Sequence, residues 1–307
     1  MARMPRGIEL DKECVYHLRA QAAGPKGYYP LQEEKNAREL TRLIRHYVGL
    51  YFCQAAGFEI MGSHYHLPVR FEPYRELAPQ ELLELAQRFY SGAYRPYQAW
   101  SKKQWQVFNR RLFHVSELMR NIGQAFTRWH NQRHGRKGPF WAGRFRSSDS
   151  HDLEATVYYV ELNAVRAGLV DRPEQWPYSS VWMRGHADDA WLMPLDRLLP
   201  SRDRAEAERL YWVRLYWTGT KPSKETDALI PVELARQMER EKFPRGCFLN
   251  RYEPLSRGQE IGDFETIQAR LRQCREAGVY RRRTRPIALG VGNLYALREP
   301  RSSYLRI

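Results

Sequence analysis

The sequence predicts a domain that mixes strands and helices in the order β-α-β-β, followed by a mainly helical and basic region. Three observations lead to this prediction. Short segments near the start alternate apolar and polar residues and are rich in Val and Tyr, which is typical of strands. Longer segments place apolar residues at helical spacing, and from about residue 200 the chain is helical and charged. With 307 residues and 43% hydrophobic content, the chain can bury the core of one large or two smaller domains.

The expected elements follow this order along the chain. Strands are predicted at 13–21, 53–61 and 63–71, with a helix at 31–52 after the first strand and the tight turn MGS between the last two. Helices are predicted at 79–90 and at 115–135, where Gly135 ends the helix. A short aromatic strand, FWAGRFRSS, precedes a helix at 150–170 that Ser150 or Asp152 can cap and Gly168 can stop. Three more helices are predicted at 202–217, 231–243 and 264–278, before a tail with little periodicity.

The charge of the chain is strongly positive and unevenly distributed. Fifty Lys and Arg stand against 35 Asp and Glu, which gives a net charge of +15. Residues 101–146 carry a net +10 and residues 270–307 a net +8, so the remainder is net −3. Because a merely solvated surface would mix its signs, this pattern predicts a polyanionic partner, a nucleic acid.

Other composition features exclude several classes of protein. No run approaches the roughly 18 consecutive apolar residues of a membrane span, and the first residues lack the apolar core of a signal peptide. We therefore expect a cytoplasmic protein without a membrane partner. The four cysteines are scattered without a Cys-x-x-Cys pair, which predicts neither a disulfide framework nor a structural zinc site.

The stretch MGSHYHLPVRF places His64 and His66 one residue apart in a predicted strand. Residues i and i+2 of a strand share a face, so both imidazoles project together while Tyr65 and Leu67 point into the core. Two imidazoles in this arrangement can chelate one divalent ion. A His-x-His pair alone is a weak signal, and ordinary surface or core histidines are the alternative.

The stretch ATVYYVELNAVRAG places a tyrosine and an amide on one face of a predicted helix. Tyr159 and Asn163 are four residues apart and share a face, whereas Tyr158 points about 100° away. Tyrosine is a poor nucleophile at its usual pKa near 10, but a phosphate polarised by a metal ion can accept its attack. The alternative is that both tyrosines are packing aromatics of an amphipathic helix.

The stretch RHGRKGPFWAGRFRSS interleaves basic and aromatic residues. Basic groups hold phosphates and aromatic faces stack unpaired bases, so this composition is typical of single-strand or hairpin recognition. The alternative is a sheet edge with aromatics in the core and charges in solvent. The candidate DNA-binding residues of this part of the chain are Arg128, Arg133, Arg136, Lys137, Phe140, Trp141, Arg144 and Arg146, and a second basic run contributes Arg281, Arg282 and Arg283.

Four motifs taken in order resemble a known family. The stretches MGSHYHL, LMRNIGQAFTRWHNQRHGRKGPFWAGRFRSS, YYVELNAVRAGLV and WPYSSVW look like those of the REP-associated tyrosine transposases, single-tyrosine HUH relatives of small insertion-sequence transposases. The resemblance runs from about residue 6 to residue 182, some three fifths of the chain.

This resemblance implies an α+β fold, an antiparallel sheet backed by helices as in HUH endonucleases, at 1–195, with a helical, Arg-rich accessory region at 196–307. It implies that Tyr159 is the nucleophile, and that His64, His66 and Asn163 bind Mg²⁺ or Mn²⁺. The implied activity is cleavage and rejoining of single-stranded DNA at hairpin-forming repeats through a 5′-phosphotyrosine intermediate. It would need no nucleotide cofactor.

Two other functions compete with this activity. A domesticated hairpin-binding regulator would keep the DNA affinity without turnover, and a rolling-circle replication initiator would use similar chemistry. In each case we expect a nucleoid-associated monomer or homodimer whose partner is single-stranded or hairpin DNA.

Overall fold

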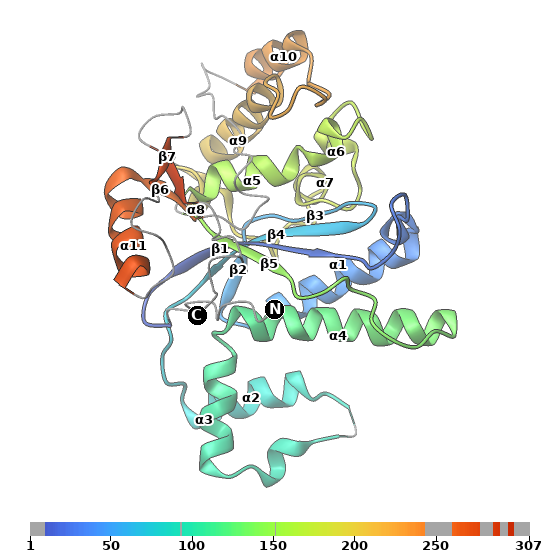
Figure 1. The fold of residues 1–307 in the computed structure, drawn as a ribbon, viewed down its shortest axis with the longest axis vertical. Helices are drawn as coiled ribbons and strands as arrows, with labels where there is room; N and C mark the ends of the chain where they lie inside the picture. Colours follow the sequence, from blue (N-terminus) through green and yellow to red (C-terminus); the bar gives the residue numbers. More distant parts are fainter. Residues whose placement is uncertain are drawn as a thin grey trace.

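The computed structural model describes residues 10–92, 94–150, 152–242, 260–276, 285–288 and 294–297, and Figure 1 shows the arrangement of its elements. Its strands are β1 (Cys14–Gln21), β2 (Cys53–Ala55), β3 (Glu59–Ile60), β4 (His64–Phe71), β5 (Arg146–Asp149), β6 (Glu260–Asp263), β7 (Ile287–Ala288) and β8 (Leu294–Leu297). Its helices are α1 (Glu34–Val48), α2 (Pro79–Phe89), α3 (Lys102–Arg111), α4 (Val115–His134), α5 (Leu153–Glu161), α6 (Asn163–Arg166), α7 (Ser180–Gly185), α8 (Leu195–Leu198), α9 (Arg204–Gly219), α10 (Val232–Lys242) and α11 (Phe264–Glu276). None of these helices is long and apolar enough to cross a membrane.

An antiparallel sheet forms the centre of the molecule. The strand order is β2-β4-β1-β5, and the short β3 pairs with the first half of β4. The predicted order β-α-β-β is confirmed, because β1, α1, the β2–β3 segment and β4 follow one another along the chain. β1 and β4 pair along their whole length, so the register between them determines which side chains meet on each face.

One face of this sheet packs on the main hydrophobic core. Tyr65 and Leu67 are 1% and 0% exposed, as the alternation of β4 predicts, and Leu18 of β1 lies on the same face. α1 and α4 cover this face with their apolar stripes, and Figure 1 shows them along the same side of the sheet. Gly135 ends α4 in the left-handed conformation that glycine adopts without a Cβ penalty.

The opposite face of the sheet carries α5, which joins it to a second hydrophobic cluster. Tyr158 of α5 is fully buried, and its ring centroid lies 6.0 Å from that of Tyr211 on α9. Residues of α5, α8, α9 and α10 contribute to this cluster. The domain boundary near residue 195 stays a prediction, but α8, α9 and α10 share one core with the helix that carries Tyr159.

Several predicted elements in the first part of the chain differ from the structure. The single strand expected at 53–61 is divided into β2 and β3. The single helix expected at 150–170 is interrupted at Leu162 (φ −100°, ψ 2°), so α5 ends and α6 begins around it. Asp152 caps α5, since its Oδ1 accepts a hydrogen bond from Ala155 N at 2.8 Å. The aromatic strand is also shorter than predicted, because only its last residues join the sheet as β5, which ends at Asp149. The helix α3, with a capping box formed by Ser101 and Gln104, was not among the predicted elements.

The accessory region is not purely helical. α9, α10 and α11 confirm the predicted helices, but β6, β8 and β7 form a second antiparallel sheet. Strands of two to four residues are too short to produce a periodic pattern over the window that sequence patterns need. The predicted contacts of Arg281, Arg282 and Arg283 lie outside the described residues.

Candidate active site

His64 and His66 share the face of β4 that looks away from the α1–α4 core, as predicted. Their ring centroids lie 4.9 Å apart, and the two rings are nearly perpendicular. His66 is 2% exposed, whereas His64 keeps part of its surface in solvent. Burial, and then the nearby positive charges of Arg19 and His17, lower the pKa of His64 to about 3. His64 is therefore a neutral imidazole at neutral pH, the form that can coordinate a metal ion.

A third histidine joins this pair from the neighbouring strand. His17 of β1 is 2% exposed, and its Nε2 lies 2.8 Å from His66 Nδ1. The two rings are stacked with centroids 5.0 Å apart. Sequence reasoning missed His17, because it stands 49 residues from His66 and only the β1–β4 register brings them together.

Tyr159 faces the histidines and Tyr158 does not. The ring of Tyr159 lies edge-on to His17 at 5.6 Å and to His66 at 6.1 Å between centroids. Tyr158 points into the second hydrophobic cluster, where burial raises its pKa well above the usual value. The helical phase therefore separates the two tyrosines in the direction that the sequence predicts. Tyr159 is 4% exposed, so little of the residue reaches solvent in this structure.

Asn163 is the first residue of α6, directly after the interruption at Leu162. Its Nδ2 donates a hydrogen bond to Val160 O at 3.0 Å, and its side chain is half-buried. The position of α6 depends on a buried carboxylate that the sequence did not single out. Glu59 is 0% exposed, pairs with His66 across the β3–β4 register, and its Oε1 accepts a hydrogen bond from Ala164 N at 3.2 Å. Glu59 thereby connects the strand of the histidines to the start of α6.

Two arginines extend the histidine face across the sheet. Arg19 of β1 stands opposite His66 on one side and opposite Arg146 of β5 on the other. Burial and the nearby Arg146 lower the pKa of Arg19, while Tyr159 acts on it in the opposite direction. The buried Nε of Arg19 has no hydrogen-bond partner. Like charges on neighbouring strands repel each other, so this pair is suited to an anion between the two guanidinium groups.

The residues present fit a divalent metal ion in part. If His66 Nδ1 donates to His17 Nε2, the lone pair of His66 Nε2 stays available to a metal, and the bond holds the ring in one orientation. Together with the neutral His64 this provides two nitrogen ligands. Within the described residues, no three His, Cys, Asp or Glu side chains are grouped closely enough to hold a metal ion. The amide oxygen of Asn163 would have to complete the ligand set, as the sequence predicts.

The basic segment at the end of α4 is exposed, but its aromatic residues are not. Arg128, Arg133, Arg136, Lys137, Arg144 and Arg146 all lie on the surface. Phe140 is 5% exposed and packs 4.9 Å from the ring of Phe126, and Trp141 donates its Nε1–H to Gly123 O at 3.0 Å. Base stacking on Phe140 would require the core to open, and the DNA-binding roles of Phe140 and Trp141 stay predictions.

Comparisons with known proteins add one similar structure. No family model matches the chain, and no curated protein matches it. A solved structure of a REP-associated tyrosine transposase bound to a REP hairpin is similar over 63% of this chain and 89% of that chain. The sequence identity is 13% and the TM-score is 0.39.

Proposed function

We propose that this chain binds single-stranded or hairpin DNA and breaks and rejoins one phosphodiester bond through Tyr159. The observation that carries the proposal is the position of Tyr159, whose ring stands edge-on to both His17 and His66. A tyrosine beside paired imidazoles and an unpartnered arginine nitrogen has the groups that phosphoryl transfer requires, a nucleophile and cations around the reacting phosphate.

The reaction conserves the energy of the phosphodiester bond that it breaks, because it exchanges that bond for a phosphate ester of Tyr159. Tyr159 Oη attacks the phosphorus and loses its proton, and the bond from phosphorus to the 3′ oxygen breaks. The 3′ oxygen leaves as a hydroxyl after taking up a proton, and the 5′ phosphate stays esterified to Tyr159. Attack by a 3′-hydroxyl on this phosphotyrosine reverses the sequence and releases the tyrosine. No nucleotide cofactor is needed because each step exchanges one phosphate ester for another.

The chain's own groups have separate roles in this proposal. Mg²⁺ or Mn²⁺ held by His64, His66 and Asn163 would polarise the phosphate. His17 orients His66 through the bond between their ring nitrogens. Arg19 and Arg146 hold the phosphate oxygens from the neighbouring strands. The exposed basic residues at the end of α4 bind the flanking DNA backbone.

One observation favours a second function, a hairpin-binding protein without turnover. Tyr159 is 4% and His66 2% exposed, so a DNA strand has to displace neighbouring groups before the hydroxyl can reach a phosphate. A protein that binds DNA through its basic surface alone would not need this opening.

The deciding experiment looks for the covalent intermediate. The wild-type protein is incubated with a hairpin that carries a labelled single-stranded flank and Mn²⁺, and label that migrates with protein under denaturing conditions is measured. We expect an adduct from the wild type and from Tyr158→Phe, and none from Tyr159→Phe, with similar hairpin affinity for all three. No adduct from the wild type across a panel of tightly bound hairpins would favour the binding protein.

The metal is tested in the same assay. We expect the double variant His64→Ala, His66→Ala to bind the hairpin nearly as the wild type does, since phosphate contacts dominate affinity. It should form no adduct in Mg²⁺ or Mn²⁺. An adduct that survives in this variant, or in the wild type with excess chelator, would show that the two histidines are not metal ligands.

A further inference from the structure

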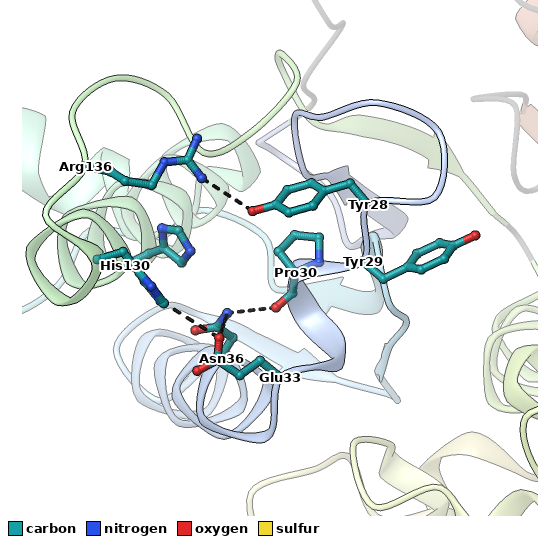
Figure 2. Close-up of a pocket in the computed structure, with 8 residues that line it drawn as sticks. Tyr28, Tyr29, Pro30, Glu33, Asn36, His130 and Arg136 are labelled. Atoms are coloured by element: carbon teal, nitrogen blue, oxygen red, sulfur yellow. Dashed lines mark hydrogen bonds and ion pairs between the residues drawn. The ribbon is translucent and has the colours of Figure 1, made fainter.

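A separate cavity of about 280 Å³ lies between the segment that precedes α1 and the C-terminal end of α4. Figure 2 shows its lining residues: Tyr28, Tyr29, Pro30, Glu33, Asn36, His130, His134 and Arg136. Its volume is close to the lower end of ligand pockets, roughly 300 Å³, which suits one small ring system. None of the catalytic groups described above lines it.

Asn36 contributes a buried acceptor to this cavity. Its side chain is 1% exposed, and its Nδ2 donates to Pro30 O at 2.7 Å and to Glu33 Oε2 at 3.2 Å. Because both of these neighbours are acceptors, the nitrogen of the amide has to face them. The Oδ1 is therefore fixed on the other side, where it is buried without a hydrogen-bond partner. A buried acceptor without a partner is costly, and a ligand donor would remove that cost.

His130 contributes a second unpartnered atom and a flat surface. The residue is 3% exposed, and its Nδ1 is buried without a hydrogen-bond partner. Its ring lies 4.3 Å from the ring of His134 and 4.6 Å from that of Phe140. Burial, together with the charges of His134 and Arg136, lowers the pKa of His130, so its imidazole is neutral at neutral pH. The inner wall is therefore aromatic and uncharged.

The rim of the cavity combines aromatic rings with one acid and one base. Tyr28 and Tyr29 are 36% and 51% exposed, which is unusual for large aromatic side chains. Arg136 Nη1 lies 3.4 Å from Tyr28 Oη, and Figure 2 shows these two side chains opposite each other, with Glu33 on the far side of the cavity. The bases of single-stranded nucleic acids stack on exposed aromatic rings of this kind and bond to the polar groups beside them.

The cavity adjoins the turn that leads to the candidate active site. Leu31 N donates to Gly62 O at 2.9 Å, and Ala22 N donates to Ser63 O at 2.8 Å, so the segment with Tyr28 and Tyr29 is anchored to residues directly before His64. A Cβ at Gly62 would come within 3.0 Å of Tyr29 Cβ, which shows how closely the two segments pack. A strand that passes the histidines can therefore place a neighbouring base in the cavity.

We propose that this cavity binds one unpaired guanine of the DNA strand, an inference that rests on the proposed function. The Watson–Crick edge of guanine carries two adjacent donors, N1–H and the N2 amino group, and these fit Asn36 Oδ1 and Glu33 Oε1. The other oxygen of Glu33, Oε2, already accepts from Asn36 Nδ2 and lies 4.0 Å from His134 Nε2. Its O6 and N7 are acceptors, which fit the guanidinium of Arg136. Adenine, cytosine and thymine do not present two adjacent donors. The exposed ring of Tyr28 provides the stacking surface.

The test measures affinity and does not depend on cleavage. A hairpin with a single-stranded flank is made with an abasic site at each flank position in turn, and the sensitive position is then filled with each of the four bases and with hypoxanthine. We expect one position at which guanine binds about tenfold more tightly than adenine. Hypoxanthine, which lacks only the amino group, should lose most of this preference. The ratio of the two affinities is the measured quantity, so changes in net charge cancel.

Two neighbouring variants make the test specific. Glu33→Gln should reduce the guanine-to-adenine ratio several-fold, because an amide oxygen is a weaker acceptor than a carboxylate for a guanine donor. Glu34→Gln removes the same charge one residue away, where Glu34 pairs with Arg38 outside the cavity, and should keep the wild-type ratio. Equal ratios in the wild type and Glu33→Gln, or a flank in which no base matters, would overturn the guanine site.

The outcomes also separate this site from the proposed function. If the protein selects guanine but forms no tyrosine adduct, the cavity assignment is supported and the proposed enzymatic activity is wrong. If the protein forms the adduct but shows no base preference in the flank of the hairpin, the enzymatic activity is supported and the cavity assignment is wrong. A protein that binds no DNA overturns both.

Discussion

His17 Nε2 and His66 Nδ1 lie 2.8 Å apart, and this contact joins β1 to β4 beside the ring of Tyr159. We expect His17→Phe, which keeps an aromatic ring but loses the nitrogen, to raise the Mn²⁺ concentration for half-maximal cleavage about 10- to 100-fold. His17→Gln can still accept a hydrogen bond and should show a smaller shift. Hairpin affinity without metal should stay the same in both variants. The same half-maximal Mn²⁺ concentration in all three proteins would mean that His17 does not orient a metal ligand.

Arg19 should serve the reaction more than the stability of the fold. Its Nε is buried without a hydrogen-bond partner, so replacing it with Met removes an unfavourable burial. We expect Arg19→Met to leave the urea midpoint unchanged or higher while it lowers the cleavage rate about 100-fold.

Arg70 provides a matched control for Arg19. It lies on β4, bonds Gln54 Oε1 at 2.8 Å and pairs with Glu13 at 3.7 Å, so its charge already has a partner. Arg70→Met should therefore leave cleavage close to the wild-type rate. Loss of stability in Arg19→Met in proportion to its loss of activity would indicate a structural role instead.

DNA binding should depend steeply on salt. If exposed basic residues contact phosphates, the log–log slope of affinity against salt should be about −0.7 for each phosphate neutralised on a single strand. Arg144→Ala should make this slope less steep by about that amount. Arg209→Ala, on the exposed face of α9, is the control and should leave the slope unchanged. A slope near zero for the wild type between low and physiological salt would contradict the nucleic-acid hypothesis.

Glu161 should hold α5 to the helices that follow it. Its Oε1 accepts from Ser180 Oγ at 2.7 Å, its Oε2 accepts from Tyr211 Oη at 2.8 Å, and Arg184 Nε lies 3.9 Å away. We expect Glu161→Ala to lower the free energy of unfolding by about 3 kcal/mol, because it removes the acceptor of the buried Tyr211 hydroxyl and leaves Arg184 with Asp189 as its remaining carboxylate. Urea denaturation measures this change. Glu208→Ala, exposed on α9, should change it by less than about 0.5 kcal/mol, and an equal effect of both would remove this role for Glu161.

Several features of the site follow from the sequence because they depend on neighbours along the chain. The two-residue period of a strand places His64 and His66 on one face and Tyr65 on the other, and the structure agrees. The helical period separates Tyr159 from Tyr158 in the same way, although the helix is interrupted three residues after Tyr159. The catalytic and metal-binding roles of these residues stay predictions.

Only the tertiary structure decided which residues from other elements join this face. His17 and Arg19 reach it through the register of β1 with β4, and Glu59 through that of β3 with β4. Long-range pairing of this kind leaves no local period in a single sequence. The burial of a residue also depends on long-range packing. The sequence of a basic segment allows an aromatic residue to stack a base or to lie in the core, and the packing of α4 against the sheet placed Phe140 in the core. Asn36 and His130, each with a buried atom that has no hydrogen-bond partner, likewise line one cavity because the segment before α1 folds against the end of α4, far away in the sequence.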